Sequence, residues 1–447
     1  MRGIVAALLL TSAGGFATRR TLLRLSVQSR GVPDSAAPPA PSLRSDVASF
    51  KVMDVVESAQ ALEAEGHRVY HLEVGQPSTG APAAVKRAAA RALDTEKLGY
   101  TQSKGIPELR EAIIKHYYEV GGIPEGSLDP ERLVITTGSS GGFLLAFAAC
   151  FDKDDHVAVG STCYPCYRNI LESMDCHPAI IQLNKEFKLT ATQLRAEVER
   201  RKDAGLPPLK GVIQSSPSNP TGSTLTPAEV EEMCAFCAAE GMWFLSDEIY
   251  HGINFGEQAA SALRFPQYAD NVMVLNSFSK YFSMTGWRLG WMVLPEGLVD
   301  SVYRLQQNMF INAPTLSQLA AVECFSEESI DELEGHVARY TENREIVMST
   351  LERLEIPISP CNGAFYVYAD LGDLAGDVAQ GLGAEVLCET FLREKKVAIT
   401  PGTDFEDPAS GMGFKRIRFS FPGATEDVRE AMKRFEEWWP SWLERCA

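Results

Sequence analysis

Short apolar runs recur between about residue 130 and residue 295 of the chain. Their residues are apolar at consecutive positions instead of alternating with polar ones, which is typical of strands covered on both faces. Helical patterns separate the runs, so crossover connections and a mostly parallel sheet are predicted. The runs occupy residues 133–136, 157–160, 179–183, 211–214, 243–246, 272–275 and 290–294.

The C-terminal third has a different pattern and predicts a smaller α+β domain. Residues 363–369, 396–400 and 416–421 read as strands, with helical segments between and after them. The last helix is expected to begin near Thr425, to bury Val428, Met432 and Phe435, and to stop or kink at Pro440. The fold class is therefore α/β with a mostly parallel large-domain sheet. The expected divisions are a leader (1–45), an N-terminal arm with part of the small domain (46–95), a large domain (96–320) and a C-terminal small domain (321–447).

The N-terminus looks like a removable address. An apolar stretch over residues 3–16 is followed by an arginine- and serine-containing stretch without acids and by the proline-rich residues 35–42. This two-part pattern resembles the plastid address of algae with complex plastids, which makes a plastid the expected location. A mitochondrial presequence and a disordered arm that stays in place are the alternatives.

Composition excludes several classes of protein. The 447 residues are 45% hydrophobic and 23% charged, as in an ordinary globular protein, and no apolar run reaches the roughly 18 residues that span a bilayer. A net charge of −17 argues against nucleic acid or an anionic membrane as partner. The pairs Cys163/Cys166 and Cys234/Cys237 have zinc-site spacing, but buried thiols are the simpler interpretation, and no metal is expected.

Lys280 lies in a segment with unusual chemistry. A lysine can hold an aldehyde as a Schiff base, while the hydroxyls of Ser277 and Ser279 and the guanidinium of Arg288 can hold a phosphate. Pyridoxal phosphate carries both groups on one small ring. A lysine between serines is more often a solvated loop residue, so the interpretation depends on signals elsewhere in the chain.

Polar or aromatic residues follow the other predicted strands, at the edge where ligands of such sheets bind. Ser139 and Ser140 lie in a glycine-rich turn before a helix, which suits a phosphate, although a plain turn is the alternative. Tyr164 follows the second run and can stack on a pyridine ring, with Tyr167 in reserve and ordinary loop packing as the alternative.

Two further strand ends carry groups that suit a pyridine ring. The Asn219 amide can donate to a phenolate oxygen, and Tyr250 can donate to the same oxygen. Asp247 ends a buried apolar run, where a carboxylate is costly unless it is paired. A protonated ring nitrogen is a suitable partner, and it would keep the ring cationic.

In this order, the residues resemble those of pyridoxal-phosphate-dependent aminotransferases of class I/II, with the aspartate-aminotransferase fold (fold type I). The match runs from about residue 72 to residue 439. Its landmarks are residues 75–77, 100–110, 137–138, 219–222, 247–250, 277–280, 288 and 418–420. The resemblance implies that Tyr100 reaches the phosphate of a neighbouring subunit, and hence a homodimer with shared active sites. It also implies that Gly75 and Arg418, with Asn219, bind the substrate, although Arg418 could simply decorate an edge strand.

The activity that this resemblance implies is transamination between an L-amino acid and a 2-oxo acid. Lys280 would hold the cofactor as an aldimine and then move the substrate proton, with Asp247 and Tyr250 as its catalytic partners and pyridoxamine phosphate as the intermediate form of the cofactor. A lyase or synthase, such as a carbon–sulfur lyase, is the alternative on the same fold. An aminotransferase-like transcription regulator is a more distant one, because it needs a DNA-binding module where this chain has its predicted address.

The sequence says less about the substrate. One branch of the family is expected to carry a lysine near Ser140, for the distal carboxylate of aspartate, and this chain has serine there. Strict aspartate specificity is therefore not expected. Residues 400–405 resemble those of broad-specificity bacterial-type members.

Overall fold

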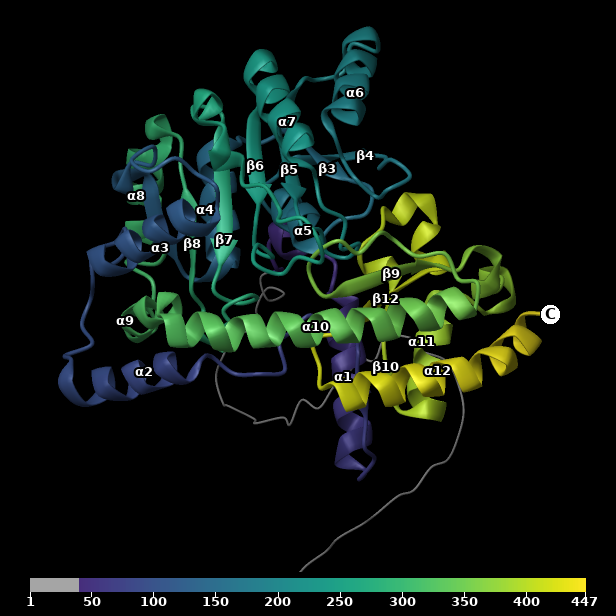
Figure 1. Ribbon diagram of the computed structural model, residues 1–447. Coiled ribbons are helices and arrows are strands. Elements are labelled where there is room, and N and C mark those ends of the chain that lie inside the picture. Colours follow the sequence, from purple (N-terminus) through teal and green to yellow (C-terminus); the bar gives the residue numbers. More distant parts are fainter. Residues whose placement is uncertain (1–39) are drawn as a thin grey trace, which may run out of the picture. The chain divides into compact units, whose positions relative to one another are not determined.

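A computed structural model describes residues 40–447, and residues Leu43–Ala447 form one compact unit. Its largest sheet has seven strands in the order β2-β8-β7-β6-β5-β3-β4 (Figure 1). The strands are β2 (Leu133–Thr136), β3 (His156–Gly160), β4 (His177–Ile181), β5 (Leu209–Ser215), β6 (Trp243–Asp247), β7 (Val272–Ser277) and β8 (Gly290–Val293). β8 is antiparallel to both of its neighbours, and the other pairs are parallel. The mostly parallel sheet predicted from the apolar runs is confirmed.

Helices cover both faces of this sheet, which explains why its strands are apolar at consecutive positions. Val157 and Val159 belong to a core shared with one set of helices, while Ala158 between them belongs to the core on the other face. The first set is α4 (Gly138–Cys150), α5 (Pro165–Ser173) and α8 (Val299–Met309). The second set is α3 (Pro107–Val120), α6 (Ala191–Asp203) and α7 (Pro227–Glu240).

The C-terminal third forms a three-stranded antiparallel sheet with long helices against it. Its strands, in spatial order, are β11 (Thr400–Pro401), β12 (Arg416–Ser420) and β9 (Tyr366–Asp370). The helices are α10 (Glu327–Arg353), α11 (Ala384–Lys395) and α12 (Thr425–Cys446), and α10 and α12 lie side by side (Figure 1). The strand predicted over residues 396–400 is divided at Ile399 into β10 and β11, which belong to two different sheets.

The N-terminal region joins this C-terminal part. β1 (Tyr70–His71) pairs in parallel with β10 (Val397–Ala398), and α1 (Lys51–Ala64) packs against β10 and β11. α2 (Ala83–Thr95) packs against α9 (Thr315–Ala321). The arm therefore contributes a strand next to a strand of the C-terminal part, while the predicted division into a leader, an arm and two domains stays a prediction.

α12 does not stop at Pro440, which was one of the two outcomes expected there. Val428, Met432 and Phe435 are buried as predicted, but the helix runs through Pro440 to Cys446 instead of stopping there. The ring of Trp442, beyond the proline, is buried and donates to the Leu374 carbonyl at 3.0 Å. Packing on both sides of the proline outweighs the loss of its hydrogen bond. No helix in residues 40–447 is long and apolar enough to cross a membrane.

The thiols of Cys234 and Cys237 are buried on α7, as predicted. Burial raises the pKa of Cys234 to about 12 and raises that of Cys237 as well. Both side chains therefore stay protonated at neutral pH and act as small apolar groups in the core.

Candidate active site

A cavity of about 420 Å³ lies at the carboxyl ends of the parallel strands. β2, β3, β5, β6 and β7 all run in the same direction, so the residues that follow them meet at one edge of the sheet. Of the thirteen residues predicted for the site, eleven line this cavity. They are Gly75, Ser139, Ser140, Tyr164, Asn219, Asp247, Tyr250, Ser279, Lys280, Arg288 and Arg418.

Lys280 follows β7 and projects an amine into the cavity. Its Nζ donates to the Gly75 carbonyl at 2.6 Å. Burial lowers the pKa of Lys280 to about 8, and the positive charges of Arg418 and Arg288 act in the same direction. An appreciable fraction of this lysine is therefore neutral near pH 8, which is the form that can attack an aldehyde or accept a proton.

Asp247 is the last residue of β6, next to β7, and faces the same cavity. The residue is only 3% exposed, and burial raises the pKa of its carboxyl to about 6. Hydrogen bonds from the Tyr167 hydroxyl and, at 3.1 Å, from the Ile249 amide act against this rise. A buried carboxylate held in this way suits a cationic ligand atom.

Tyr167 has a role that the sequence did not reveal. It was the reserve candidate for stacking on a ring, but its hydroxyl donates a short hydrogen bond to Asp247 Oδ2. The Tyr164 ring stands nearly perpendicular to it, with centroids 5.6 Å apart. The spacing of the two tyrosines was visible in the sequence, but the division of their roles depends on how α5 packs on the sheet.

An anion-binding cradle forms at the start of α4. Ser139 and Ser140 lie in the first turn of this helix, where free backbone N–H groups and the helix dipole favour negative charge, and Ser279 and Arg288 line the same cavity. Gly138 has φ +67°, and a Cβ at this position would lie 2.5 Å from Arg288 Nη2. Glycine therefore lets the arginine approach the helix start.

Two predicted residues lie outside the cavity. Ser277 is buried behind it, and its hydroxyl is hydrogen-bonded to Ser279 Oγ at 3.0 Å, so it supports Ser279 from below. Tyr100 is 82% exposed and lies in the loop between α2 and α3. Its predicted contact is with a neighbouring subunit, which stays a prediction.

Arg418 and Asn219 are hydrogen-bonded to each other and line the cavity. Arg418, on β12, donates through Nη1 to Asn219 Oδ1 at 2.8 Å, which leaves the amide N–H groups of Asn219 to serve a ligand. The guanidinium lies 4.5 Å from the ring centroids of both Tyr366 and Phe405. Its Nη2 donates to the Glu73 carbonyl, and its buried Nε has no hydrogen-bond partner among residues 40–447. Arg418 lines the cavity, where a guanidinium suits a carboxylate.

An apolar wall also lines the cavity, next to polar residues such as Gln76 and Thr285. Phe50, Val52 and Met53, at and just before the start of α1, line it together with Val74 and Ile249. The start of α1 is fixed by Asp404, whose carboxylate accepts from the backbone amides of Lys51 at 2.9 Å and Val52 at 3.3 Å.

A larger cavity of about 680 Å³ lies elsewhere, among α3, the residues after β6 and the start of α10. It contains none of the predicted site residues. His116 and Tyr281 line it, but it lacks the lysine, the buried aspartate and the anion cradle. We therefore take the cavity of about 420 Å³, which contains these groups, as the candidate active site.

Known proteins are similar to this chain in sequence and in fold. Residues 68–435 match the family "Aminotransferase class I and II". The chain is 42% identical to the valine–pyruvate aminotransferase of Mycobacterium tuberculosis, over 90% of this chain and 98% of that protein. The crystal structure of an aminotransferase from the same organism superposes with a TM-score of 0.83 at 42% identity, over 90% of this chain and 100% of that one.

A more distant structure supports the fold type. A double mutant of the Thermus thermophilus aspartate aminotransferase has a TM-score of 0.79 at 26% identity, over 89% of this chain and 99% of that one. The fold and the transaminase activity expected from the sequence are confirmed. The chain belongs to the class I and II aminotransferases, a pyridoxal-phosphate-dependent family of enzymes.

Proposed function

We propose that this enzyme transfers the amino group of an aliphatic L-amino acid to a small 2-oxo acid such as pyruvate, with pyridoxal phosphate bound at Lys280. One observation carries the assignment of the site. The Lys280 amine and the Asp247 carboxylate face one cavity from the ends of neighbouring strands. The two groups are the ones needed at opposite ends of the cofactor ring.

The other lining residues fit the remaining parts of the cofactor. Ser139, Ser140, Ser279 and Arg288 suit its phosphate, because they combine a helix start, hydroxyls and a guanidinium. Tyr164 offers an aromatic face for the ring. When bound, pyridoxal phosphate supplies an aldehyde that condenses with amines and a ring that accepts the electron pair left at the substrate α-carbon.

The protein's own groups orient the substrate and move its proton. Arg418 and the Gly75 backbone hold the α-carboxylate, which fixes the position of the α-carbon. Lys280, with its pKa near 8, accepts the α-proton and returns it. The carboxylate of Asp247 would hold a proton at the ring nitrogen, and Tyr250 and Asn219 would donate to the ring oxygen.

The apolar wall supports a neutral substrate side chain. Phe50, Val52 and Met53 offer a surface for a branched aliphatic chain. The cations among the lining residues are Lys280, Arg288 and Arg418, and each already has a role, so the cavity of the described chain offers no spare cation for a second carboxylate. The identity of 42% to a valine–pyruvate aminotransferase points the same way.

The half-reaction tests this proposal. The enzyme loaded with pyridoxal phosphate is mixed with one amino acid at a time, and the appearance of pyridoxamine phosphate is followed by absorption. Valine and alanine should convert the cofactor at least about tenfold faster than aspartate, since leaving a buried carboxylate unpaired costs more than 1.4 kcal/mol. A preference for aspartate would contradict the substrate assignment, and release of sulfide from added cysteine without formation of pyridoxamine phosphate would favour the lyase alternative.

We further propose a homodimer in which Tyr100 completes the phosphate site of the neighbouring subunit. The exposure of Tyr100 and its position outside its own cavity support this assignment. A tyrosine exposed on a loop is available to a second subunit, and burying its amphipathic side chain at an interface costs little free energy.

Residues 1–45 are proposed to direct the protein to a plastid, with the mitochondrion as the alternative. The apolar stretch and the acid-free, arginine-containing stretch after it support this proposal, and residues 1–39 lie outside the described residues. A fluorescent protein fused after residue 45 should enter the organelle, and a fusion to residues 46–447 should not.

A further inference from the structure

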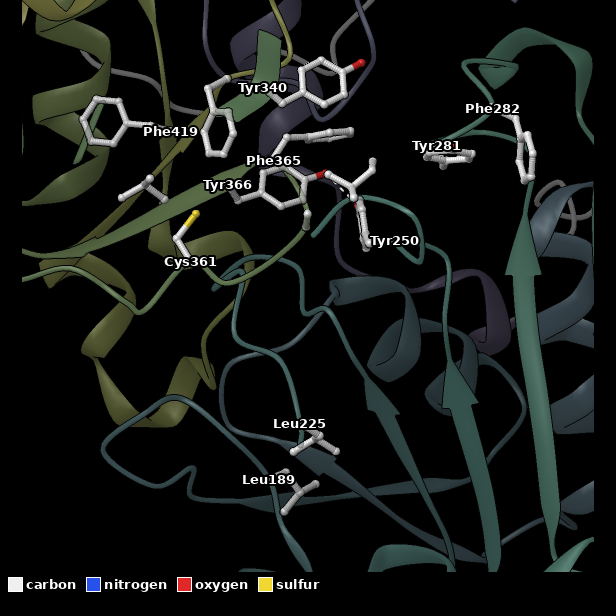
Figure 2. Packing of buried hydrophobic residues seen from close by; sticks show 14 of the residues in the cluster. Leu189, Leu225, Tyr250, Tyr281, Phe282, Tyr340, Cys361, Phe365, Tyr366 and Phe419 are labelled. Atoms are coloured by element: carbon white, nitrogen blue, oxygen red, sulfur yellow. Dashed lines mark hydrogen bonds between the residues drawn. The ribbon is translucent and has the colours of Figure 1, made fainter. Parts of the chain in front are cut away.

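Tyr366 was not among the predicted site residues, yet it lines the cavity. It is the first residue of β9 and is 1% exposed. Its hydroxyl is 2.7 Å from the hydroxyl of Tyr250, and Figure 2 shows the two side chains joined by this hydrogen bond. Tyr250 is the residue assigned to the cofactor ring oxygen, so Tyr366 stands directly behind it.

Three neighbours fix the position of the Tyr366 ring. A Cβ at Gly75 would lie 1.8 Å from the Tyr366 hydroxyl, so only glycine leaves room for it. The guanidinium of Arg418 lies 4.5 Å from the ring centroid. The Tyr250 ring packs edge-on, with centroids 5.5 Å apart. The hydroxyl therefore cannot swing away from Tyr250 without moving residues of the carboxylate site.

The pair of hydroxyls has a defined proton arrangement once a ligand oxygen is present. Burial raises the pKa of both phenols, so each carries its single proton at neutral pH. Each hydroxyl has the other as its hydrogen-bond partner among residues 40–447. If Tyr250 donates its proton to the ring oxygen, its own oxygen must accept from Tyr366.

We propose that Tyr366 is a positioning residue, whose hydroxyl donates to Tyr250 and directs the Tyr250 proton toward the ring oxygen of the cofactor. The inference rests on the proposed role of Tyr250. A hydroxyl that accepts a hydrogen bond becomes a stronger donor, because hydrogen bonds in a chain polarise one another. Tyr366 therefore tunes the charge on the ring oxygen through Tyr250.

The protonation of the bound cofactor reports this effect. The ring oxygen carries most negative charge after the nitrogen that joins Lys280 to the cofactor has lost its proton. A strong donor at the ring oxygen therefore favours the form in which this nitrogen is deprotonated. In Tyr366→Phe, which removes only the hydroxyl, the midpoint of the visible absorption change of the loaded enzyme should move up by about 0.5 to 1 pH unit. The measurement is a pH titration of absorbance without substrate.

Tyr250→Phe and the double variant separate this inference from the function on which it depends. Tyr250→Phe should raise the midpoint further. Adding Tyr366→Phe to it should then leave the midpoint unchanged, because the Tyr366 hydroxyl acts on the cofactor only through the Tyr250 hydroxyl. No shift in Tyr250→Phe would overturn the role of Tyr250 and the inference with it. A shift in Tyr250→Phe with none in Tyr366→Phe, or additive shifts in the double variant, would overturn the inference alone.

Tyr368→Phe is a matched control on the same strand. Its buried hydroxyl donates to Glu406 at 2.7 Å, so the variant should lose stability while the absorption midpoint stays unchanged. Gly75→Ala displaces the Tyr366 hydroxyl from the opposite side and keeps the test available if Tyr366→Phe does not fold. It should raise the midpoint in the same direction, and an unchanged midpoint in Gly75→Ala would contradict the proposal.

Discussion

Asp247 suits a cationic ligand atom, but its buried charge lowers the stability of the cofactor-free protein. The pKa of its carboxyl is about 6 in the folded state, above the value of about 4 expected in an unfolded chain. The folded state therefore binds more protons between these two values, and the free energy of unfolding falls as the pH rises through this window. Above about pH 6 the buried charge destabilises the cofactor-free protein throughout.

Asp247→Asn should therefore stabilise the cofactor-free protein at pH 7 by about 2 kcal/mol. The single oxygen of asparagine can still accept from the Ile249 amide, its NH2 group takes the place of Oδ2 and can donate to the Tyr167 hydroxyl, and the side chain carries no charge. The gain should disappear below about pH 4, where the aspartate is protonated in both states. Denaturant unfolding at several pH values measures it, and a gain that does not change with pH would contradict the explanation.

The same substitution should lower kcat by about 10²- to 10³-fold, because the neutral amide cannot hold a proton at the ring nitrogen. Steady-state kinetics with saturating pyridoxal phosphate measures this loss. Unchanged kcat together with raised stability would mean that Asp247 is a buried charge without a catalytic function.

Most single residues of the site could be predicted, since the chemistry of Lys280 and Asp247 follows from residue type and from their places at strand ends. Tyr167 and Tyr366 could not be assigned in this way. Their roles depend on which hydroxyl meets which neighbour, and this is decided by the packing of α5 on the sheet and of β9 against the residues after β6. Ser277 was placed in the right segment, but the backbone turns its hydroxyl toward Ser279.

Among the elements, α1 links the fold of the small sheet to the wall of the site. Its first residues line the cavity, and its first two backbone amides donate to Asp404, which follows β11. Fixing these amides satisfies donors that a helix start otherwise leaves open. The position of the apolar wall therefore depends on a carboxylate about 350 residues further along the chain.

Asp404→Ala should weaken this wall. The free energy of unfolding should fall by about 1 kcal/mol, because the start of α1 loses its cap. The KM for valine should rise about fivefold, because the apolar residues at this helix start then hold the substrate side chain less firmly. Thr226→Ala is the matched control, since Thr226 caps α7 on the outer face of the large sheet. It should cost similar stability and leave the KM unchanged. Equal KM values in the two variants would show that α1 does not set the substrate wall.

The large-sheet strands were predictable from their apolar runs, but two other elements were not. Ile399 separates β10 from β11, because neighbouring residues pair with β1 on one side and β12 on the other. The local pattern contains nothing that reveals two pairing partners from distant parts of the chain. α12 continues past Pro440 because its tryptophans pack on both sides of the proline, which is again a tertiary effect.

For the molecule as a whole, the proposed dimer predicts that two variants with impaired activity regain activity when they form mixed dimers. Lys280→Ala removes the amine, and Tyr100→Ala removes a phosphate contact from the neighbouring site. In a mixed dimer one active site carries both changes and the other carries neither. Refolding an equal mixture should therefore produce about a quarter of wild-type activity, since half of the dimers are mixed and half of their sites are intact.

The control for this experiment is a mixture of Lys280→Ala with Asp247→Asn. Lys280 and Asp247 line the same cavity of one subunit, so each site of a mixed dimer carries one of the two changes, and activity should stay low. Recovery with Asp247→Asn would contradict the assignment of both groups to one cavity, and no recovery with Tyr100→Ala would place Tyr100 in the active site of its own subunit or outside both.

The covalent position of the cofactor decides whether this description of the enzyme is correct. Reduction of the loaded protein with borohydride fixes pyridoxal phosphate on the lysine that holds it, and peptide mass spectrometry then identifies that residue. The cofactor should be found on Lys280, and Lys280→Ala should trap none. Trapping on another lysine, or equal trapping in Lys280→Ala, would contradict the assignment of the cavity and of every role derived from it.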